Sequence, residues 1–163
     1  MSNLDLLLGA LDEANWEFSL VFEGLSDEDL WRRPHPKLLS VGELAGHVAY
    51  WTAIGITTHL PENSPDRIQS ALVDKRFDYY TNEIDQAITL DLGVEFVAAE
   101  VKRIHERAKA MIVQANPELT DPNPSRPSFT WAGHLKYQAF HVAYHTGQAY
   151  SVRHLLGHTT TDN

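Results

Sequence analysis

Hydrophobic residues recur along this chain at intervals of three and four, the spacing that places them on one face of an α-helix. The pattern is clear in four segments and predicts long amphipathic helices at about 3–23, 41–60, 94–115 and 130–156. No segment of comparable length alternates with the period of two expected for a β-strand. The pattern therefore predicts an all-α fold.

Local signals mark the ends of these helices. Gly24 can end the first helix, and Gly157 can end the last one. Ser40 and Glu43 have the spacing of a capping box, in which each side chain accepts a backbone N–H at the start of the second helix. Pro117 stops the third helix. These signals agree with the boundaries that the hydrophobic pattern predicts.

The connections differ in length and character. Residues 25–30 predict a short helix that Pro34 and Pro36 stop. Between 61 and 90 the helical pattern weakens, although Ser64-Pro65 could start a short helix and 77–88 shows no clean period. Residues 121–127 are rich in proline and are expected to form a loop without regular structure, after which Ser128 or Thr130 caps the last helix.

Four helices joined in this way predict a four-helix bundle that forms a single domain over residues 1–163. About 15 residues join the first helix to the second and the third to the fourth. The connection between the second and third helices is longer, so the chain can return along the bundle. We therefore expect an up-down-down-up arrangement with the second and third helices parallel.

Histidines suggest the chemistry. His141 and His145 are four residues apart, so both can face one metal ion from the last helix, and His47 is expected to point inward from the second helix. The alternative is that they are ordinary core histidines, because 9 histidines in 163 residues produce about half of one such pair by chance. A second pair of this spacing, His154 and His158, does occur. One metal ion bound by all three inward histidines is therefore a hypothesis that the fold must test.

Composition limits the partners. The chain has 13 Lys and Arg against 22 Asp and Glu, and a net charge of −9 repels nucleic acids and anionic membranes. It has no cysteine, which excludes disulfides, thiolate ligands and a cysteine nucleophile in this chain. No apolar run approaches the ~20 residues that span a bilayer, and no basic region precedes the first one. We expect a cytoplasmic protein that contacts neither nucleic acid nor membrane.

Three segments resemble the DinB-like family. The last helix has His-x-x-x-His followed by Gly147-Gln148 and an Arg-containing stretch before Gly157. The segment 44–51 around His47 is similar to the histidine segment of the family's second helix, and 25–34 resembles the stretch that usually precedes it. Together these segments cover nearly the whole chain except 61–90.

This resemblance implies an up-down-down-up bundle that binds a divalent metal, commonly zinc, nickel or iron, through His47, His141 and His145. Characterised relatives include transferases and isomerases that use low-molecular-weight thiols, such as bacillithiol transferases and mycothiol-dependent maleylpyruvate isomerase. Many members have no known reaction. The family name refers to induction by DNA damage and implies no DNA binding.

The residues themselves narrow the reaction. Three imidazoles leave a coordination position open, as catalytic rather than structural zinc sites do. In His-Glu-x-x-His hydrolases a glutamate follows the first histidine, whereas here Val142 does. We therefore favour a thiol-dependent S-transferase or isomerase that acts on a small molecule. A metal-dependent hydrolase with a base such as Glu43, and a bundle that binds metal or ligand without turnover, are the alternatives.

Other residues are candidates to support this site. Gln148, His134 and Gln138 share the inward face of the last helix, and Glu43 lies one turn before His47. All four could equally be ordinary buried hydrogen-bonding residues. Tyr50, Trp51 and Trp131 suggest an apolar or aromatic substrate, although such residues are also ordinary core residues.

The opposite face of the last helix suggests an interface. Phe140, Ala143, Gly147 and Tyr150 form an apolar stripe there, which a simple bundle would leave exposed. We expect either a homodimer through this face or a cover formed by residues 61–90.

Overall fold

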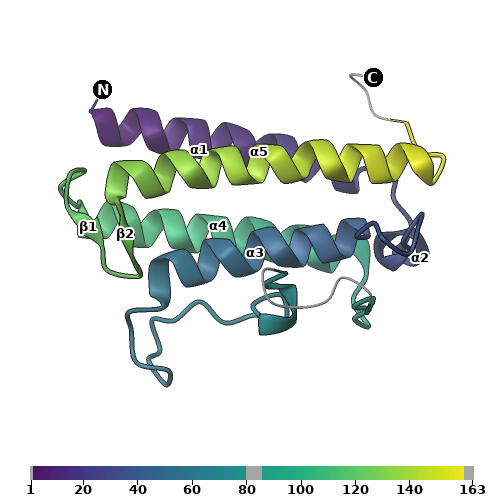
Figure 1. Cartoon of the computed structure of the whole chain (residues 1–163), viewed down its shortest axis with the longest axis horizontal. Helices are drawn as coiled ribbons and strands as arrows, with labels where there is room; N and C mark the ends of the chain where they lie inside the picture. The colour runs from purple at the N-terminus through teal and green to yellow at the C-terminus, as the bar shows by residue number, and fades with distance from the viewer. Residues whose placement is uncertain (1, 80–85, 160–163) are drawn as a thin grey trace.

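A computed structural model describes residues 2–79 and 86–159, and this part of the chain contains five α-helices and one small sheet (Figure 1). The helices are α1 (Asn3–Ser19), α2 (Asp27–Trp31), α3 (Val41–Thr57), α4 (Val94–Ala115) and α5 (Trp131–Leu155). Two 3-10 helices, η1 (Leu20–Phe22) and η2 (Lys75–Phe77), and the strands β1 (Pro122–Asn123) and β2 (Arg126–Thr130) complete them. The predicted mostly helical fold is confirmed.

The four long helices α1, α3, α4 and α5 lie side by side (Figure 1). α1 packs along α5, and α3 packs against α4 and α5. The start of α4 is bonded to α2, because the Val94 N–H donates to Asp27 Oδ1 at 2.7 Å. The hairpin that follows α4 lies beside the end of α3, where Asn123 Nδ2 donates to the Gly55 carbonyl at 3.0 Å. α3 and α4 therefore run in the same direction.

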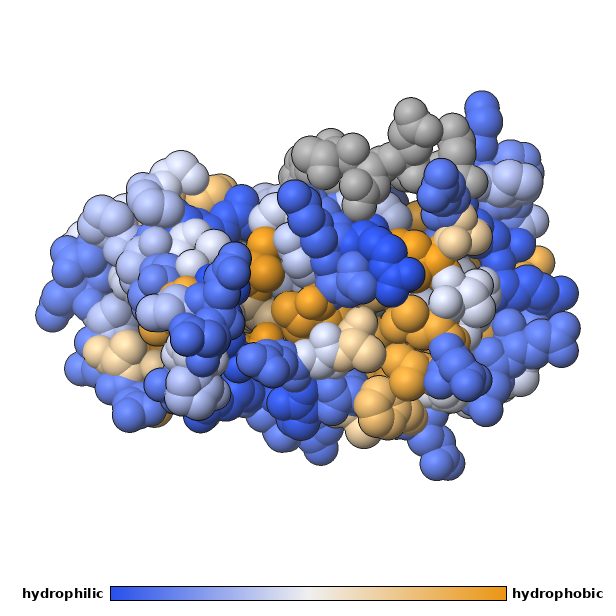
Figure 2. Space-filling view, turned by 90° about the horizontal axis from the view of Figure 1, so that it is seen from below, coloured by the Kyte–Doolittle hydropathy of each residue, from blue (hydrophilic) through white to orange (hydrophobic). Residues whose placement is uncertain are grey.

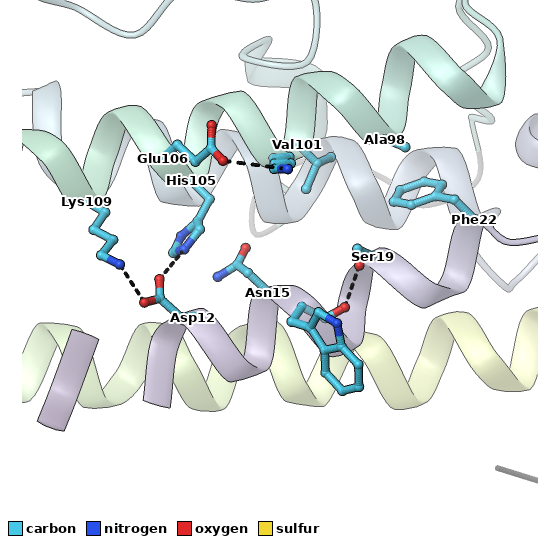
Figure 3. Close-up of a pocket in the computed structure, with 11 residues that line it drawn as sticks. Asp12, Asn15, Ser19, Phe22, Ala98, Val101, His105, Glu106 and Lys109 are labelled. Atoms are coloured by element: carbon cyan, nitrogen blue, oxygen red, sulfur yellow. Dashed lines mark hydrogen bonds and ion pairs between the residues drawn. The ribbon is translucent and has the colours of Figure 1, made fainter. Parts of the chain in front are cut away.

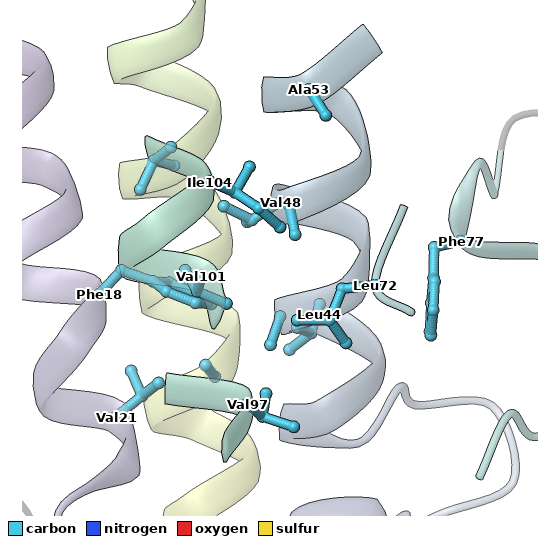
Figure 4. Packing of buried hydrophobic residues seen from close by; sticks show 14 of the residues in the cluster. Phe18, Val21, Leu44, Val48, Ala53, Leu72, Phe77, Val97, Val101 and Ile104 are labelled. Atoms are coloured by element: carbon cyan, nitrogen blue, oxygen red, sulfur yellow. The ribbon is translucent and has the colours of Figure 1, made fainter. Parts of the chain in front are cut away.

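The core lies between these helices. Side chains from α1, α3 and α4 meet in its centre, as Phe18, Leu44 and Ile104 show, and each is at most 2% exposed (Figure 4). The connection after α3 adds Leu72 and Phe77, both fully buried. Burial of large apolar side chains is worth about 1.5–3 kcal/mol each, so this connection is part of the core.

Glycines on α3 allow its neighbours to pack closely. A Cβ atom on Gly46 would lie 2.5 Å from Cδ1 of Phe77, and one on Gly42 would lie 2.6 Å from Cε3 of Trp31. Both distances are shorter than carbon atoms tolerate. The absence of a side chain at these positions therefore lets two aromatic rings lie directly on the α3 backbone.

Several predicted helix boundaries were wrong by a few residues. The first helix was expected to reach residue 23, but α1 ends at Ser19 and tightens into η1 before Gly24, whose φ is +66°. The second helix was expected to reach residue 60, but α3 ends at Thr57. The hydroxyls of Thr57 and Thr58 bond back to carbonyls in the last turn of α3, which competes with regular continuation of the helix.

The connections also differed from the predictions. Ser64-Pro65 does not start a helix, because the Ser64 hydroxyl accepts the N–H of Asp66 and forms a turn. The lack of period predicted for 77–88 falls partly on residues 80–85, which lie outside the described residues. In the described part of the connection 61–90 the chain forms η2, which the sequence did not predict.

The expectation of an irregular loop at 121–127 was wrong. β1 and β2 form an antiparallel hairpin in which Asn123 pairs with Arg126 across a two-residue turn. Asn123 Oδ1 accepts the Ser125 N–H at 2.8 Å, which stabilises the turn. Proline fixes an extended φ and only removes a donor, so a two-stranded ribbon with two free edges tolerates it.

None of the helices in the described ranges is long and apolar enough to cross a membrane. Seen from below, hydrophobic residues gather in the middle of the surface, while hydrophilic residues occupy both ends (Figure 2). The connection between α3 and α4 lies on this side of the molecule (Figure 1).

We predict that Gly46→Ala destabilises the protein by about 1–3 kcal/mol, because the new methyl group overlaps the buried ring of Phe77. The loss should outweigh the gain of about 1 kcal/mol from the better helix propensity of alanine. Urea unfolding measures the difference. Gly9→Ala in α1 is the matched control, because no atom lies within 4 Å of its added Cβ and this variant should be more stable than the wild type. Equal stabilisation of both variants would contradict the close packing at Gly46.

Candidate metal centre

Three histidines converge between α3 and α5. His141 Nε2 lies 3.1 Å from His47 Nε2 and 3.1 Å from His145 Nε2. All three ligand nitrogens lie within 4.8 Å of one another, and the residues are only 5%, 7% and 9% exposed for His47, His141 and His145. In residues 2–79 and 86–159 this is the one group of three or more His, Asp or Glu side chains with metal-site geometry.

Hydrogen bonds on the far side of two rings orient their nitrogens. The Nδ1–H of His47 donates to the Phe77 carbonyl at 2.7 Å, and the Nδ1–H of His145 donates to Gln148 Oε1 at 2.7 Å. A neutral imidazole has one N–H, so both rings present a bare Nε2 lone pair to the centre. Metal-ligating histidines are commonly oriented in this way, by a hydrogen bond from the ring nitrogen that does not bind the metal.

Coordination of one divalent metal would satisfy the three Nε2 atoms better than hydrogen bonds among them. If His141 Nε2 carries the ring's proton, it can donate to the lone pair of His47 or to that of His145, but not to both. The other lone pair then faces the centre without a donor. His141 Nδ1 also has no partner among the described residues. Ligands 2.0–2.1 Å from a tetrahedral zinc ion lie roughly 3.3 Å apart, close to the 3.1 Å separations seen here. Three histidines could therefore hold a metal ion.

Burial keeps these imidazoles neutral. It lowers the pKa of His141 to about 3, with smaller contributions from the charges of His145, His47 and Arg126. Burial, with the charge of His47, lowers the pKa of His145 to about 4 despite its bond to Gln148. Burial also lowers the pKa of His47. Only neutral imidazole binds metal, so all three are in the ligating form at neutral pH.

The histidines lie at the base of a pocket of about 340 Å³. Its other lining residues are mostly aromatic: Leu39, Tyr79, Tyr137, Phe140, Tyr144 and Gln148. The aromatic lining was expected, but not from these residues. Trp131 is buried elsewhere against His134, and neither Trp51 nor Tyr50 lines the pocket. Spacing on α5 could have indicated Tyr137 and Tyr144, which lie one turn before and about one turn after His141.

Tyr79 has an unusual conformation beside the triad. Its φ is +52°, a value that is costly for a bulky residue and that concentrates at functional sites. Its ring lies 5.4 Å from that of His47, and its buried hydroxyl has no hydrogen-bond partner among the residues that the structure describes. Burial raises the pKa of Tyr79, so the phenol stays protonated and can donate to a ligand. No sequence signal identified this residue.

Residues 10–149 match the sequence profile of the DinB superfamily. The chain belongs to the DinB superfamily. Comparisons with curated proteins and with solved structures found no match. The resemblance inferred from the sequence is thus confirmed at the level of the superfamily.

In this DinB superfamily member, one of the four supporting candidates contacts the triad. Gln148 lines the pocket and accepts from His145, as its position on the inward face suggested. Gln138 donates to the Trp51 carbonyl at 2.9 Å and links α5 to α3. This hydrogen bond joins two helices and does not involve a histidine of the triad.

Glu43 lies one turn before His47, but its carboxylate is committed to other groups. It accepts two hydrogen bonds from Arg33, at 2.6 and 2.8 Å. It also accepts the backbone N–H groups of Ser40 and Ile88, each at 2.8 Å. The two carboxylate oxygens, both buried, therefore join α3 to the segments on either side of it and do not line the pocket.

A second pocket, of about 300 Å³, lies between α1 and α4 of this superfamily member (Figure 3). Asp12 accepts from His105 Nε2 at 2.9 Å and from Lys109 Nζ at 2.6 Å. Both of its oxygens are occupied by side chains across the groove. His105 Nδ1 is buried without a partner among the described residues, but no second or third histidine lies beside it in this lining.

His134 is fully buried, and neither ring nitrogen has a hydrogen-bond partner within the described part of the chain. A Cβ atom on Gly55 would lie 2.7 Å from its ring, so the imidazole packs directly on α3. Burial, and then the charge of Arg126, lower its pKa to about 4. His134 was a candidate to support the triad, but it makes no hydrogen bond to any of the three histidines.

We predict that His134→Leu makes the stability of the metal-free protein less sensitive to acid. The folded-state pKa of His134 is below the unfolded value near 6.5, so the unfolded state takes up a proton first and stability falls as the pH drops from 6.5 towards 4. The loss is up to about 3 kcal/mol, at about 1.4 kcal/mol per pKa unit. Urea unfolding at pH 7 and pH 5 measures it, with the exposed His35→Leu as control. Parallel pH profiles for wild type and His134→Leu would disprove the assignment.

Proposed function

We propose that His47, His141 and His145 bind one divalent metal ion, with zinc, nickel and iron as the candidates, and that the protein transfers a low-molecular-weight thiol to a small molecule or isomerises it. The observation that carries this proposal is that the ligand nitrogens of three histidines converge at a pocket whose described lining contains no carboxylate. Membership of the DinB superfamily supports metal binding.

A divalent metal at this position would supply an open coordination site and lower the pKa of a bound thiol. A free thiol has a pKa near 8.5 and water one near 15.7, so a thiol needs much less help from a protein base. The aromatic walls formed by Tyr137, Phe140 and Tyr144 suit an apolar or unsaturated acceptor. The Tyr79 hydroxyl, which stays protonated, can donate a hydrogen bond to the acceptor as charge develops.

A metal-dependent hydrolase is the alternative that one observation favours. Asp78 has a buried carboxylate oxygen without a partner among the described residues, and its charge acts on His47. It could serve as the base that water requires, although it does not line the pocket. Glu43 is less suited, because four hydrogen bonds hold its carboxylate. Binding of metal or ligand without turnover is the third reading.

We also interpret the four long helices as an up-down-down-up bundle, which the shared direction of α3 and α4 supports. A single domain over residues 1–163, a cytoplasmic location and the absence of a nucleic-acid partner remain predictions from the sequence.

The first test is metal stoichiometry. Protein purified without an affinity tag should contain about one divalent metal per chain by elemental analysis, and His47→Ala and His141→Ala should each lose most of it. His154→Ala is the matched control, because His154 is exposed on the same helix as His141 and belongs to the other i, i+4 pair. Full metal content in both triad variants would refute the site.

The second test separates thiol transfer from hydrolysis. Metal-loaded protein should consume bacillithiol, mycothiol or glutathione in the presence of electrophilic acceptors, and Asp78→Asn should keep most of this activity. Turnover that needs no thiol and falls at least tenfold in Asp78→Asn or Glu43→Gln would establish the hydrolase instead.

We further propose a homodimer through α5, with the interface at the part of the predicted apolar stripe that α1 does not cover. α1 covers part of the predicted stripe, since the Tyr150 hydroxyl donates to the Glu17 carboxylate. Phe140 stays 63% exposed and stacks on Tyr144, which is 54% exposed. Light scattering at tens of micromolar should give the dimer mass, and Phe140→Ser should give the monomer. A monomeric wild type would contradict the dimer and favour the alternative expectation, that residues 61–90 cover this face of α5.

A further inference from the structure

Arg126 lies in an aromatic cage that includes Tyr137, one of the residues that line the metal pocket. Its guanidinium carbon is 4.9 Å from the ring centre of Trp51, 5.1 Å from that of Phe129 and 5.9 Å from that of Tyr137. These rings come from α3, β2 and α5, so three separate elements hold one cation. Cation–π contacts of this kind fix the position of the guanidinium without neutralising its charge.

Arg126 has no anionic partner among residues 2–79 and 86–159. Each of the other arginines forms an ion pair or donates to a carbonyl: Arg32, Arg33, Arg67, Arg76, Arg103, Arg107 and Arg153. The chain has a net charge of −9, so acidic side chains are in excess. The Arg126 guanidinium is half-buried and has five N–H donors, none of which makes a hydrogen bond within the described residues. These donors are therefore available to a ligand.

This cation is close to the metal centre. Tyr137 stacks on His141 with ring centres 5.9 Å apart, and the ring centre of Trp51 is 6.4 Å from that of His47. One aromatic ring thus separates the guanidinium from each of two triad histidines. Tyr137 also lines the metal pocket, whereas Arg126 lies outside that lining, so a ligand that binds at both places would extend past the Tyr137 ring.

We propose that Arg126 binds a carboxylate group of the small molecule whose reacting end lies at His47, His141 and His145. This inference rests on the proposed metal-dependent function and specifies its substrate class. A planar carboxylate matches the fork of a guanidinium and carries one negative charge. A phosphate carries nearly two, which the single cation at this site would not neutralise. The carboxylate could belong to the thiol or to its acceptor.

The test uses cobalt(II)-loaded protein and thiols with and without a carboxylate. 3-Mercaptopropionate and 6-mercaptohexanoate are compared with the matching mercapto-alcohols, and the sulfur-to-cobalt charge-transfer band measures each dissociation constant. If the thiol supplies the carboxylate, one acid should bind about tenfold more tightly than its alcohol, as expected for a charge-assisted contact. If the acceptor supplies it, glutarate should bind to the complex with the mercapto-alcohol without displacing the thiol, which calorimetry detects.

Variants assign the effect to Arg126. Arg126→Met keeps the stem that packs against the rings and should abolish the preference for carboxylate, while Arg126→Lys should keep part of it. Arg107→Met is the control, because Arg107 pairs with Asp66 on an exposed part of α4 and should leave the preference unchanged. Circular dichroism and cobalt content verify that each variant is folded and loaded.

Two failures are distinguishable. Cobalt and mercapto-alcohol binding without any preference for carboxylate in either arm, or a preference that persists in Arg126→Met, would overturn the role of Arg126 and leave the metal site intact. Absence of cobalt from the wild-type triad would overturn both the proposed function and this inference.

Discussion

The enclosure of α3 is the constraint on which the rest of the structure depends. Fourteen of its 17 residues are buried, so every polar group on it must find a partner inside the protein. Gly42 lets Trp31 of α2 pack on the α3 backbone, and Gly46 lets Phe77 do so, which brings the connection after α3 into the core. That connection then supplies the Phe77 carbonyl to His47 and the Tyr79 ring to the pocket. Packing and site geometry therefore have one cause.

The buried polar groups of this protein fall into two kinds. Glu43 has its hydrogen bonds completed by Arg33 and two backbone N–H groups, and its role is to join segments. In the histidine triad, Nδ1 of His47 and Nδ1 of His145 are hydrogen-bonded. The three Nε2 atoms face one another, and there are too few N–H donors among them to pair every lone pair. An unsatisfied buried group costs about 1–3 kcal/mol, so the fold bears a cost at the triad that a bound cation would remove.

Membership of the DinB superfamily establishes the kind of protein without naming its reaction, because the same fold serves many functions. The distinguishing features lie around the triad. The described lining of the pocket is mostly aromatic and has no carboxylate, and Arg126 has no acidic partner among residues 2–79 and 86–159. In a chain with net charge −9, these two features of the described residues favour an anionic ligand.

The sequence alone determined the helices and the triad. Their periodicity and the capping box at Ser40 are local, and His141 and His145 lie one turn apart on one helix, so backbone geometry predicts both. Only the tertiary structure decided what depends on distant contacts. The rings around Arg126 come from α3, β2 and α5, and the bond from Ile88 to Glu43 joins residues far apart in the chain. A side chain's neighbours across the fold have no period in the sequence, so its partners, or its lack of them, emerge only when the chain is folded.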